Sequence, residues 1–462
     1  MSTTKTLKKF GFWSIVLLTI NSIIGTGIFL TPAGVMKSAG TYTPLVYLVA
    51  AIFAGVLAIT FASSAKYVNK NGAAYAYAKA AFGDNVGLYV GLTRFISSAI
   101  AWGVMATAVV RTTLSIFIGA DNITNSKITI GFVILMSVLF AINMFGNHFV
   151  EKINNISTIG KLVALVTAIV AGFVIFISTG QNHFSQVNGL IPDFSMNFTS
   201  FVGATIAAFY AFTGFESVAS AASEMENPEK NLPRAIPLAM AIIAAVYIGV
   251  VTIAMVISPE AILNSKEVVV LASAFSNPLI KNIVIYGALV SMFGINVAAS
   301  FSTPKVFQAM ASEGQLPKAL AKVNEKGVPV ASFIVTVAVA VIIPMSFRYD
   351  TTDIMVISAI SRFVQFLVVP VGVILFFRGK AKNKQDILVN AHRNPITDVF
   401  IPLVGLFMTL VLLYKFNWVG QFSLETDAGL ILNWYAIGAM VTGFVIFPAI
   451  VMLYHKFRKI NA

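Results

Sequence analysis

The chain has 462 residues, of which 58% are hydrophobic and only 11% are charged, and its mean hydropathy is +0.86. A soluble domain is usually nearer half apolar and a quarter charged, so this composition excludes an ordinary soluble globular protein. Apolar stretches of about 20 residues, each long enough to cross the hydrocarbon of a bilayer, recur along the chain. They predict an all-α membrane protein of about twelve transmembrane helices.

Chemistry that needs cysteine or clustered histidine is excluded as well. The chain has no cysteine, hence no disulfide, no thiolate metal site and no cysteine nucleophile. Its histidines are scattered and lack metal-ligand spacing; they are His148, His183, His392 and His455. We therefore expect no metal, no cofactor and no catalytic residues, and we expect a protein that is not an enzyme.

Twelve apolar segments are the predicted transmembrane helices. They cover residues 11–36, 44–65, 86–118, 128–147, 157–178, 200–222, 236–258, 282–303, 331–347, 355–377, 399–414 and 430–455. No small-residue cleavage site follows the first segment, so we expect a retained helix there and not a signal peptide. The polar stretches between segments are too short for a soluble domain.

The net charge of +13 follows the order of these helices. With the N-terminus inside, 21 of the 31 Lys and Arg residues lie in segments on the inner side, six lie outside and four lie within helices. The positive-inside rule then predicts a multi-pass protein of the cytoplasmic membrane with both termini in the cytoplasm. The basic charge is therefore a topology signal, and nucleic acid is not needed to explain it. The lipid bilayer is an expected partner of the protein.

The first predicted helix is interrupted in its middle by Gly25-Thr26-Gly27. Two glycines lower helix stability at a depth where every freed backbone group needs a partner. A break here would end one half near the carbonyl of Ile23 and start the next with the N–H groups of Thr26, Gly27 and Ile28, whose positive dipole end attracts a carboxylate. Alternatively, the glycines only allow close helix packing.

The sixth predicted helix carries a similar interruption, Phe209-Tyr210-Ala211-Phe212-Thr213-Gly214. Carbonyl groups from Tyr210 to Thr213 would accept hydrogen bonds from an ammonium group. Interruptions at corresponding positions of two halves are the best sequence pointer to a transporter's substrate site. Together the two breaks predict a site for a zwitterion.

At these residues the sequence resembles the amino acid–polyamine–organocation (APC) family of transporters. The stretch Ile24 to Phe29 is similar to the family's Gly-Ser/Thr-Gly-Ile-Phe substrate motif. Further similar stretches are Asn71 to Tyr77 after the second helix, Gly214 to Ile236 with Glu224 and Asn227-Pro228 leaving the sixth, and Glu313 to Pro317 with Gly327 to Pro329 after the eighth. The matches cover most of the first ten helices, in order.

The resemblance implies a LeuT-type five-plus-five inverted repeat with two extra helices. Residues 1–193 would hold the first repeat with the N-terminal tail and an outer loop, 194–393 the second repeat, and 394–462 the last two helices with a cytoplasmic C-terminus. It also implies amino acid transport by alternating access.

This chain departs from the family pattern at four positions. Ser63, Asn69 and Lys305 stand where relatives have glutamate, proline and arginine. Ala299, which we place beside the substrate, stands where arginine-exchanging relatives have a tryptophan. The last difference argues against an arginine substrate.

Lys161 is the first candidate for coupling. It follows Asn143, Gly146 and Lys152 at a spacing similar to that of proton-coupled and exchanger relatives. In those relatives the lysine takes the place of a sodium ion and bridges helix 5 to helices 1 and 8. Lys161 would exchange a proton during the cycle or act as a fixed sodium substitute; the alternative is a lysine that snorkels from the inner end of its helix.

Glu216 and Arg362 are further ionisable residues within predicted helices, where a functional role is the default hypothesis. Glu216 would link the substrate site to gating, or serve as a structural partner for a buried cation or a helix end. Arg362 would bind an acidic side chain of the substrate, although we favour its pairing with Glu216 or its snorkelling to the outer surface. Arg94 and Arg111 lie nearer helix ends and are expected at the interface.

The side chain of the substrate is expected to face helices 3, 6, 8 and 10, with Trp102 and Tyr210 in the pocket wall. We expect proton-coupled symport of an amino acid, with the proton as coupling ion. An amino acid exchanger, or a polyamine or nucleobase carrier, is the alternative. A channel would need a continuous polar pathway, and the sequence shows only isolated charges. The sequence does not indicate an oligomeric state.

Overall fold

The computed structural model describes residues 10–68, 72–145, 147–220, 225–325, 327–388, 391–426 and 429–460. Within these ranges nine helices are long and apolar enough to cross a membrane, and three shorter apolar helices accompany them. The prediction of an all-α multi-pass membrane protein is therefore confirmed. The sequence features at Asn69, Asn71, Gly146 and Glu224 lie outside the described residues.

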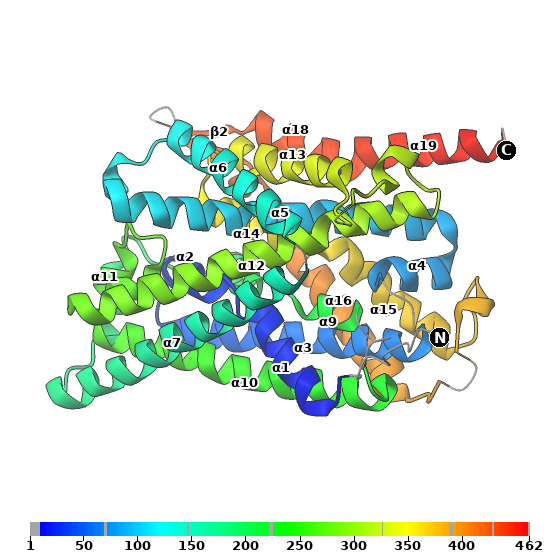
Figure 1. Cartoon of the computed structure of the whole chain (residues 1–462). Helices are drawn as coiled ribbons and strands as arrows, with labels where there is room; N and C mark the ends of the chain where they lie inside the picture. Colours follow the sequence, from blue (N-terminus) through cyan, green and yellow to red (C-terminus); the bar gives the residue numbers. More distant parts are fainter. Residues whose placement is uncertain are drawn as a thin grey trace.

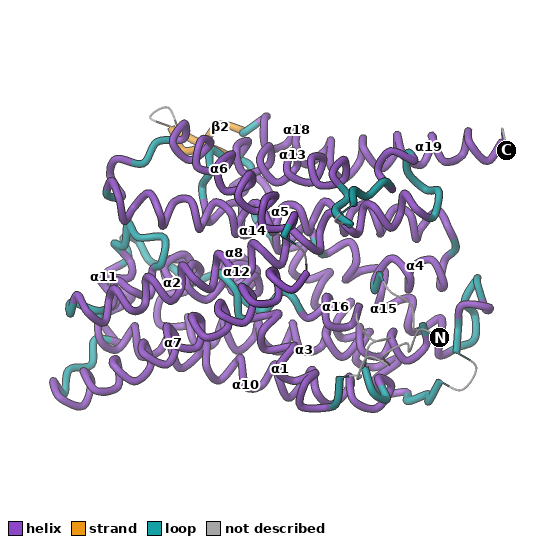
Figure 2. Tube along the Cα trace, in the orientation of Figure 1, coloured by secondary structure: helices purple, strands orange, loops and turns teal. Residues whose placement is uncertain are grey.

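The described helices group into twelve spans, which lie side by side along the long axis of the molecule (Figures 1 and 2). In chain order they are α1 (Phe12–Ile23) with α2 (Gly27–Ala39), α3 (Thr43–Tyr67), α5 (Asp84–Ile118), α6 (Asn125–Met144), α7 (Asn147–Thr179), α8 (Phe198–Tyr210) with α9 (Phe215–Ser220), α10 (Pro228–Ile257), α12 (Pro278–Ser312), α13 (Val330–Ser346), α14 (Thr351–Ser361) with α15 (Phe363–Phe377), α16 (Ile401–Lys415), and α18 (Trp434–Val441) with η9 (Thr442–Ile446) and α19 (Phe447–Ile460).

Short elements mark the two ends of the bundle. One end, here the α4 end, holds α4 (Ala74–Phe82), η6 (Lys318–Ala321), η7 (Lys384–Asp386) and η8 (Ile396–Phe400), together with the start of α1 and the end of α19. The opposite end, here the η3 end, holds η1 (Gly40–Tyr42), η2 (Ala120–Asn122), η3 (Phe184–Leu190), α11 (Pro259–Leu263), η5 (Val270–Ala274), α17 (Trp418–Gln421) and a hairpin of β1 (Ser423–Thr426) and β2 (Gly429–Leu432).

Three observed helices extend furthest beyond their predicted bounds at the α4 end. α7, α10 and α12 continue beyond the apolar segments by several residues, among them Lys230 on α10 and Gln308 on α12. Hydropathy marks only the part of a helix that suits hydrocarbon, whereas polar side chains can extend it into water. α4, which follows α3, was not predicted as a helix at all.

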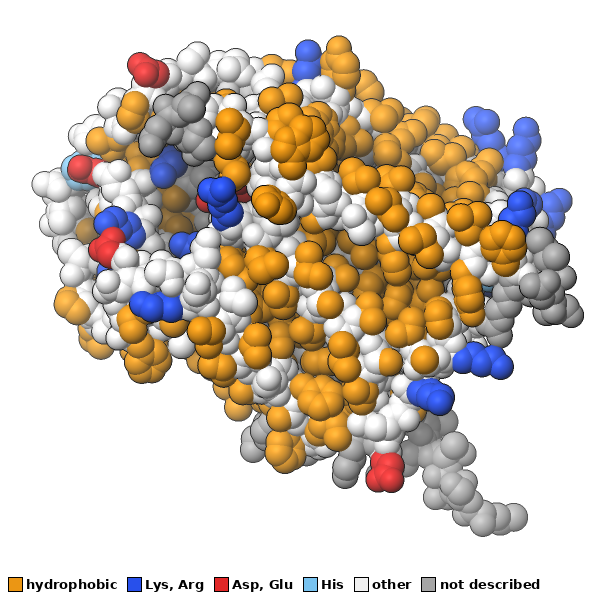
Figure 3. Space-filling view, turned by 90° about the horizontal axis from the view of Figure 1, so that it is seen from above, with side chains coloured by type: hydrophobic (Ala, Val, Ile, Leu, Met, Phe, Trp, Pro, Cys, Tyr) orange, Lys and Arg blue, Asp and Glu red, His pale blue; other side chains and the backbone are white. Residues whose placement is uncertain are grey.

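On the face seen in Figure 3, hydrophobic side chains cover the middle of the molecule, and Lys and Arg gather towards its ends. Large apolar side chains on α7 contribute to the exposed surface at helical spacing, among them Val163, Val166, Val170, Phe173 and Ile177. An apolar surface of this extent is unfavourable in water and favourable in lipid. The backbone groups of the helices are hydrogen-bonded within each helix, as they must be in hydrocarbon. The surface is that of a protein embedded in a bilayer.

Small residues allow α7 and α12 to pack closely. A Cβ added to Gly294 of α12 would collide with Ser157 of α7, and one added to Gly287 would lie 2.9 Å from the Gly160 carbonyl oxygen. Small side chains let membrane helices approach through their backbones, which compensates for the weak hydrophobic drive between helices in lipid. This packing holds one face of α12 towards the centre of the bundle, where the candidate site lies.

A buried ion pair joins η8, just before α16, to α3 at the α4 end. The Lys66 Nζ donates to Asp398 Oδ1 at 2.6 Å, and the Tyr67 hydroxyl donates to Oδ2 at 2.7 Å. The Thr397 hydroxyl and the Asn394 backbone N–H also donate to this carboxylate, at 2.8 and 2.9 Å. We call this group the α3–η8 clasp; its acid and its lysine are 0% and 5% exposed.

Candidate functional site

The first span is broken between α1 and α2, as the glycines predict. Ile24, Gly25 and Thr26 are not helical, and α2 begins at Gly27. The first amide groups of a helix have no carbonyl partner within it. The Phe29 N–H donates to the Thr26 carbonyl oxygen at 3.1 Å, so the amide groups that α2 offers to a ligand are those of Gly27 and Ile28. The break therefore presents a helix N-terminus in the middle of the bundle, where the helix dipole favours a negative group.

The sixth span is broken between α8 and α9. Three successive turn bonds follow α8: the N–H groups of Ala211, Phe212 and Thr213 donate to the third residue before each, at 2.9 to 3.2 Å. At Gly214 the backbone then adopts a φ of +120°. Glycine adopts this positive φ readily because it has no Cβ. The Gly214 N–H donates to Glu216 Oε2 at 2.8 Å, so this carboxylate holds the start of α9.

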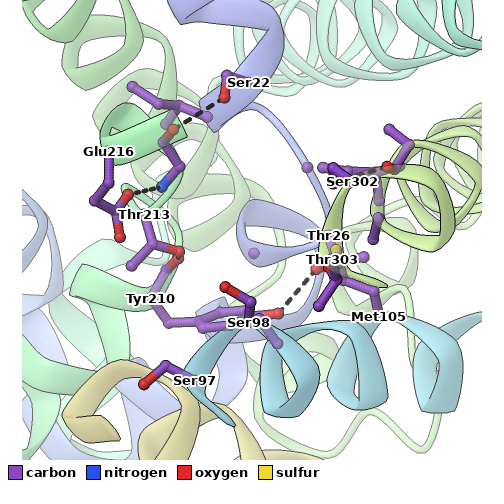
Figure 4. A pocket seen from close by; sticks show the side chains of 18 of the residues that line it. Ser22, Thr26, Ser97, Ser98, Met105, Tyr210, Thr213, Glu216, Ser302 and Thr303 are labelled. Carbon is purple, nitrogen blue, oxygen red and sulfur yellow. Dashed lines mark hydrogen bonds between the residues drawn. The ribbon is translucent and has the colours of Figure 1, made fainter. Parts of the chain in front are cut away.

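The two breaks touch each other. A Cβ added to Gly27 would collide with the backbone of Ala211, and one added to Gly214 would collide with the carbonyl oxygen of Ser22. The Ser22 hydroxyl donates to the Gly214 carbonyl at 2.9 Å. The Thr26 and Tyr210 hydroxyl groups lie 3.2 Å apart (Figure 4). Both glycines are therefore needed for close backbone approach as well as for the breaks.

A cavity of about 320 Å³ opens beside the breaks. α5 and α12 contribute its other walls, with hydroxyl groups on both sides (Figure 4). These residues are Ser97, Ser98, Ala101 and Met105 on α5, and Ile295, Ala298, Ala299, Ser302 and Thr303 on α12. They lie at the middle of their helices or towards the α4 end, and Ser302 is exposed.

Buried aromatic rings lie on the other side of the breaks, towards the η3 end. The Phe212 ring packs against Tyr47, with centroids 6.4 Å apart, and against Tyr247, with centroids 5.1 Å apart. All three rings are buried, and so is Phe29 of α2. The cavity therefore extends from the breaks towards the α4 end and is closed towards the η3 end.

Charged residues line one wall of the cavity. Arg362 lies between α14 and α15 and pairs with Glu216, with Nη1 and Oε1 2.5 Å apart. Gln365 links this pair to α5, since its Nε2 lies 3.4 Å from Glu216 Oε1 and its Oε1 accepts from Arg94 Nη1 at 3.0 Å. Glu216 is 1% exposed and Arg362 is 15% exposed. The pairing of Arg362 with Glu216 that we favoured is present.

Lys161 reaches from α7 to the first broken span. Its Nζ donates to the Asn21 carbonyl oxygen at 3.0 Å and to Asn21 Oδ1 at 2.8 Å. The Thr158 hydroxyl donates to the same Oδ1 at 2.8 Å. The lysine is 2% exposed and lines the cavity. It does not snorkel; it binds α1 just before the break.

A second cavity, of about 630 Å³, lies between α5, α13 and α18 and is almost entirely apolar. Its lining includes Phe95, Val339, Ile343 and Phe447. A zwitterion needs partners for both of its charges, and burial without them is costly. Of these two cavities, the one at the breaks is the candidate substrate site.

The structure brings together most of the residues that the sequence singled out. Those lining the cavity are Ile23, Gly25, Thr26, Gly27, Tyr210, Thr213, Gly214 and Ala299, with Lys161, Glu216 and Arg362. Four others do not line it. Trp102 packs against Phe333 with ring centroids 5.7 Å apart, Phe209 packs against Phe53 at 4.8 Å, and Phe212 and Ile28 are buried towards the η3 end.

Arg94 is the main residue that the sequence interpretation misplaced. We expected it at the interface, yet it lines the cavity beside Gln365, whereas Arg111 donates to the Tyr349 carbonyl at 2.9 Å near the η3 end. A periodic signal was present: Arg94, Ser97, Ser98 and Ala101 repeat at the spacing of one helix face. That face is the one α5 turns to the cavity.

Comparisons with known proteins agree with this geometry. A family model described as amino acid permease matches residues 10–445. An uncharacterized transporter of Mycobacterium tuberculosis is 40% identical over 98% of this chain and 96% of its own length. The branched-chain amino acid permease BcaP of Bacillus subtilis is 25% identical over 90% of each chain. The serine/threonine exchanger SteT of Bacillus subtilis is 29% identical over 67% of this chain and 69% of its own.

Proposed function

The chain belongs to the amino acid permease family, and from this premise we propose that it carries an amino acid across the cytoplasmic membrane by alternating access. The observation that carries the proposal is the contact of two broken helices beside a polar cavity. Binding at the middle of the bundle, between half-helices, is how such carriers hold a substrate while its access changes.

The breaks supply opposite partners for the two charges of an amino acid. The α-carboxylate binds the amide groups that begin α2, where the dipole and the free N–H groups act together. The ammonium group binds carbonyl oxygens at the ends of α1 and α8, near Ile23 and Thr213, both of which line the cavity. The Thr26 and Tyr210 hydroxyl groups stand between these two regions.

We propose that the α4 end faces the cytoplasm. The bias of basic residues supports this orientation through the positive-inside rule. Lys79, Lys230, Lys318 and Lys382 are examples that the structure places at the α4 end. Since the cavity extends towards the α4 end, the conformation described here faces inward.

The order and direction of the broken spans support two inverted repeats, at 1–193 and 194–393, with 394–462 outside them. α1 starts at the α4 end and α8 starts at the η3 end, so the two spans run in opposite directions. Each breaks after a first half of similar length, 12 residues in α1 and 13 in α8. Opposed halves of this kind rock against each other in alternating access.

Lys161 couples transport to a proton in this proposal. Its two hydrogen bonds to Asn21 tie α7 to the segment just before the first break. Loss of the proton removes the charge that strengthens both bonds, and this loosens α1. Exchange of one amino acid for another remains the alternative, because the names of the relatives include both a permease and an exchanger.

The test uses purified protein in liposomes and a panel of labelled amino acids. Each is offered with an inward proton gradient and empty vesicles, or without a gradient and with unlabelled amino acid inside. Gradient-dependent uptake into empty vesicles supports symport, and uptake that needs internal amino acid supports exchange. Absence of uptake for every amino acid under both conditions overturns the proposal.

Lys161→Ala then tests the coupling, with Lys127→Ala as its control. Lys127 is exposed and donates to the Asn122 carbonyl at 2.9 Å, far along the chain from the breaks. In a symporter we expect Lys161→Ala to abolish the response to the proton gradient while Lys127→Ala keeps it. Equal responses in both variants would remove Lys161 from the coupling step.

A further inference from the structure

The second cavity, of about 630 Å³, lies between α5, α13 and the last span, which is α18 with η9 and α19. Its inner wall is apolar and buried, with Phe95 and Ile96 on α5 and Ile343 on α13. Ile342 and Met345 of α13 also line the cavity, yet they are 51% and 50% exposed. The cavity is therefore closed by the bundle on one side and opens on the other side to the surrounding lipid.

Two glycines of the last span leave this space open. A Cβ added to Gly443 of η9 would meet Ile96 Cγ2 at 3.3 Å, so the last span touches α5 there. A Cβ added to Gly438 of α18 would meet nothing within 4 Å, although Gly438 lines the cavity as well. Water needs polar partners to stay in a cavity, and this lining offers few. The space beside Gly438 therefore suits an apolar group of another molecule.

The cavity has the length of a lipid acyl chain. It follows α13 from Val335 to Ser346, about 16 Å at the rise of an α-helix. The hydrocarbon of one leaflet is about 15 Å thick, half of the bilayer core. An acyl chain is flexible and thin enough to enter a space between neighbouring spans, whereas a helix is about 10–12 Å across. The size of the cavity therefore favours a lipid over a helix of another protein.

Arg348 lies at the η3 end of the cavity and is exposed. A turn after α13 holds it there: its N–H donates to the Met345 carbonyl at 3.0 Å, and the Tyr349 N–H donates to the Pro344 carbonyl at 2.8 Å. Arg348 and Tyr349 have φ values of +53° and +58°. Glycine is the usual residue in this conformation at a helix end, so an arginine here has a conformational cost. A ligand for its side chain would offset that cost.

The guanidinium of Arg348 lies at the expected level of the lipid headgroups. Trp434 and Tyr435 at the start of α18 are 70% and 84% exposed, and Tyr435 lines the cavity with Arg348. Exposed Trp and Tyr side chains gather at the interface between membrane and water. The ion pairs among the described residues do not include Arg348. Phosphate suits such a guanidinium, because it can accept two parallel hydrogen bonds.

From these observations we propose that the cavity binds an anionic phospholipid, with one acyl chain along α13 and the phosphate on the Arg348 guanidinium. The apolar walls bind the chain, and the positive charge at the opening favours an anionic headgroup over a zwitterionic one. Phe95 and Ile96 lie on the face of α5 opposite to Arg94 and Ser97, which line the candidate substrate site. The bound chain therefore packs against the back of α5. This inference does not depend on the identity of the transported substrate.

The primary experiment measures lipid binding to the purified full chain. The protein is delipidated in dodecyl maltoside and titrated with phosphatidylglycerol, or with phosphatidylcholine that has the same acyl chains. Native mass spectrometry gives the affinities, and a diazirine in the acyl chain gives the position by cross-linking. We expect phosphatidylglycerol to bind about fivefold more tightly, the effect of about one basic residue at a lipid surface. Cross-links should fall on α13 and the last span.

Two variants separate the headgroup contact from the chain contact. Arg348→Gln should weaken the binding of phosphatidylglycerol about fivefold and leave that of phosphatidylcholine unchanged. Gly438→Leu fills the cavity and should remove the cross-links of both lipids. The controls are Lys127→Gln, which removes an exposed charge at the same end, and Gly249→Leu on α10, where an added Cβ also meets nothing within 4 Å. Neither residue lines the cavity, so both variants should bind lipid as the unmodified protein does.

Each outcome supports or overturns the proposal. Equal affinities for the two lipids, unchanged by Arg348→Gln, overturn the headgroup contact. Cross-links that fall elsewhere, or that persist in Gly438→Leu, overturn the site. A dimer that dissociates in Gly438→Leu assigns the cavity to a second copy of the chain and also overturns the proposal. Size-exclusion profiles and melting temperatures show whether each variant is folded. If Gly438→Leu is not, Ala439→Leu fills the same cavity from the next residue.

Discussion

Asp398 and Glu216 are buried acids of two ion pairs among the described residues, and the two pairs differ in what surrounds them. In the α3–η8 clasp, Asp398 accepts from Lys66, from two hydroxyl groups and from one backbone N–H. In the cavity wall, Glu216 accepts from Arg362, from the Gln365 amide and from one backbone N–H. The acids are equally hidden, at 0% and 1% exposure. The clasp ties a late helix to an early one, whereas the Glu216 pair stands between two interrupted spans and faces open space.

Burial of a charge is therefore not a sufficient sign of function. The desolvation penalty of a buried ion pair is about as large as the free energy of its electrostatic attraction. Its presence is therefore explained by the elements that it holds in position. Asp398 fixes the start of α16 against α3, and its contacts are fully satisfied by protein. Glu216 holds the start of α9 and shares its environment with Arg94 and Arg362, which line the cavity. The first pair should limit stability and the second should limit transport.

The largest effect is expected from breaking the clasp. Asp398→Leu or Lys66→Met alone leaves one buried charge without its partner and should cost about 3–5 kcal/mol of stability. The double variant Lys66→Met/Asp398→Leu removes both charges and should recover most of that loss. Thermal unfolding in detergent and the yield of monodisperse protein measure both. Additive losses in the double variant would contradict this account of the clasp.

Glu216→Gln should instead reduce transport while the protein stays folded. The amide keeps the size of the side chain and can accept from the Gly214 backbone, but it loses the charge that Arg362 and Gln365 bind. We expect initial uptake to fall about ten- to hundredfold, since loss of a charged hydrogen-bond partner costs about 1.5–3 kcal/mol.

Glu267→Gln provides the control for that variant. Glu267 lies 3.4 Å from Lys281 and is 30% exposed, well outside the cavity. Its uptake should match that of the unmodified protein. If Glu216→Gln lowers the melting temperature as much as the clasp variants do, the Glu216 pair is a structural contact like the clasp.

A smaller effect is expected where the two breaks touch. Gly27→Ala forces a methyl group into the backbone of Ala211 and should cost about 1–3 kcal/mol through overpacking, with a matching loss of uptake. Gly34→Ala lies on the same helix, where the new Cβ would meet Thr352 Cγ2 at an ordinary 3.5 Å. This control should be neutral or slightly stabilising, because alanine favours a helix. Similar melting temperatures for the two variants would mean that the breaks can separate.

The smallest change in stability is expected from an exposed ion pair. Lys266 and Asp121 lie 2.6 Å apart at the η3 end, but their side chains are 72% and 76% exposed. Water and salt screen such a pair, so Lys266→Ala should change stability by less than about 1 kcal/mol. A loss of stability as large as that of the clasp variants would show that side-chain exposure does not determine how much these ion pairs contribute.

Much of this architecture could be predicted from the sequence, because hydropathy and glycine act locally. The twelve apolar segments correspond to the twelve spans, and the glycines around Thr26 and at Gly214 lie at the breaks. The rotation of each helix about its own axis could not be predicted in the same way. Trp102 and Phe209 therefore face other helices, while Arg94 faces the cavity.

Two further features depended on contacts between distant segments. Asp398 stands one residue before the predicted eleventh helix, so the sequence did not mark it as a buried charge. The tenth span is interrupted at Arg362 without a glycine there that would have predicted the break from the sequence. In both places the partner side chain lies more than a hundred residues away along the chain, at Lys66 and at Glu216.

At Gly27 and Ala211, and again at Gly214 and Ser22, the two broken spans meet backbone to backbone. A side chain can change rotamer and absorb a small displacement, but two touching backbones cannot. We therefore expect a tilt of α1 to displace the start of α9 as well. A ligand held at this contact would meet both spans at once, and its departure would release them together.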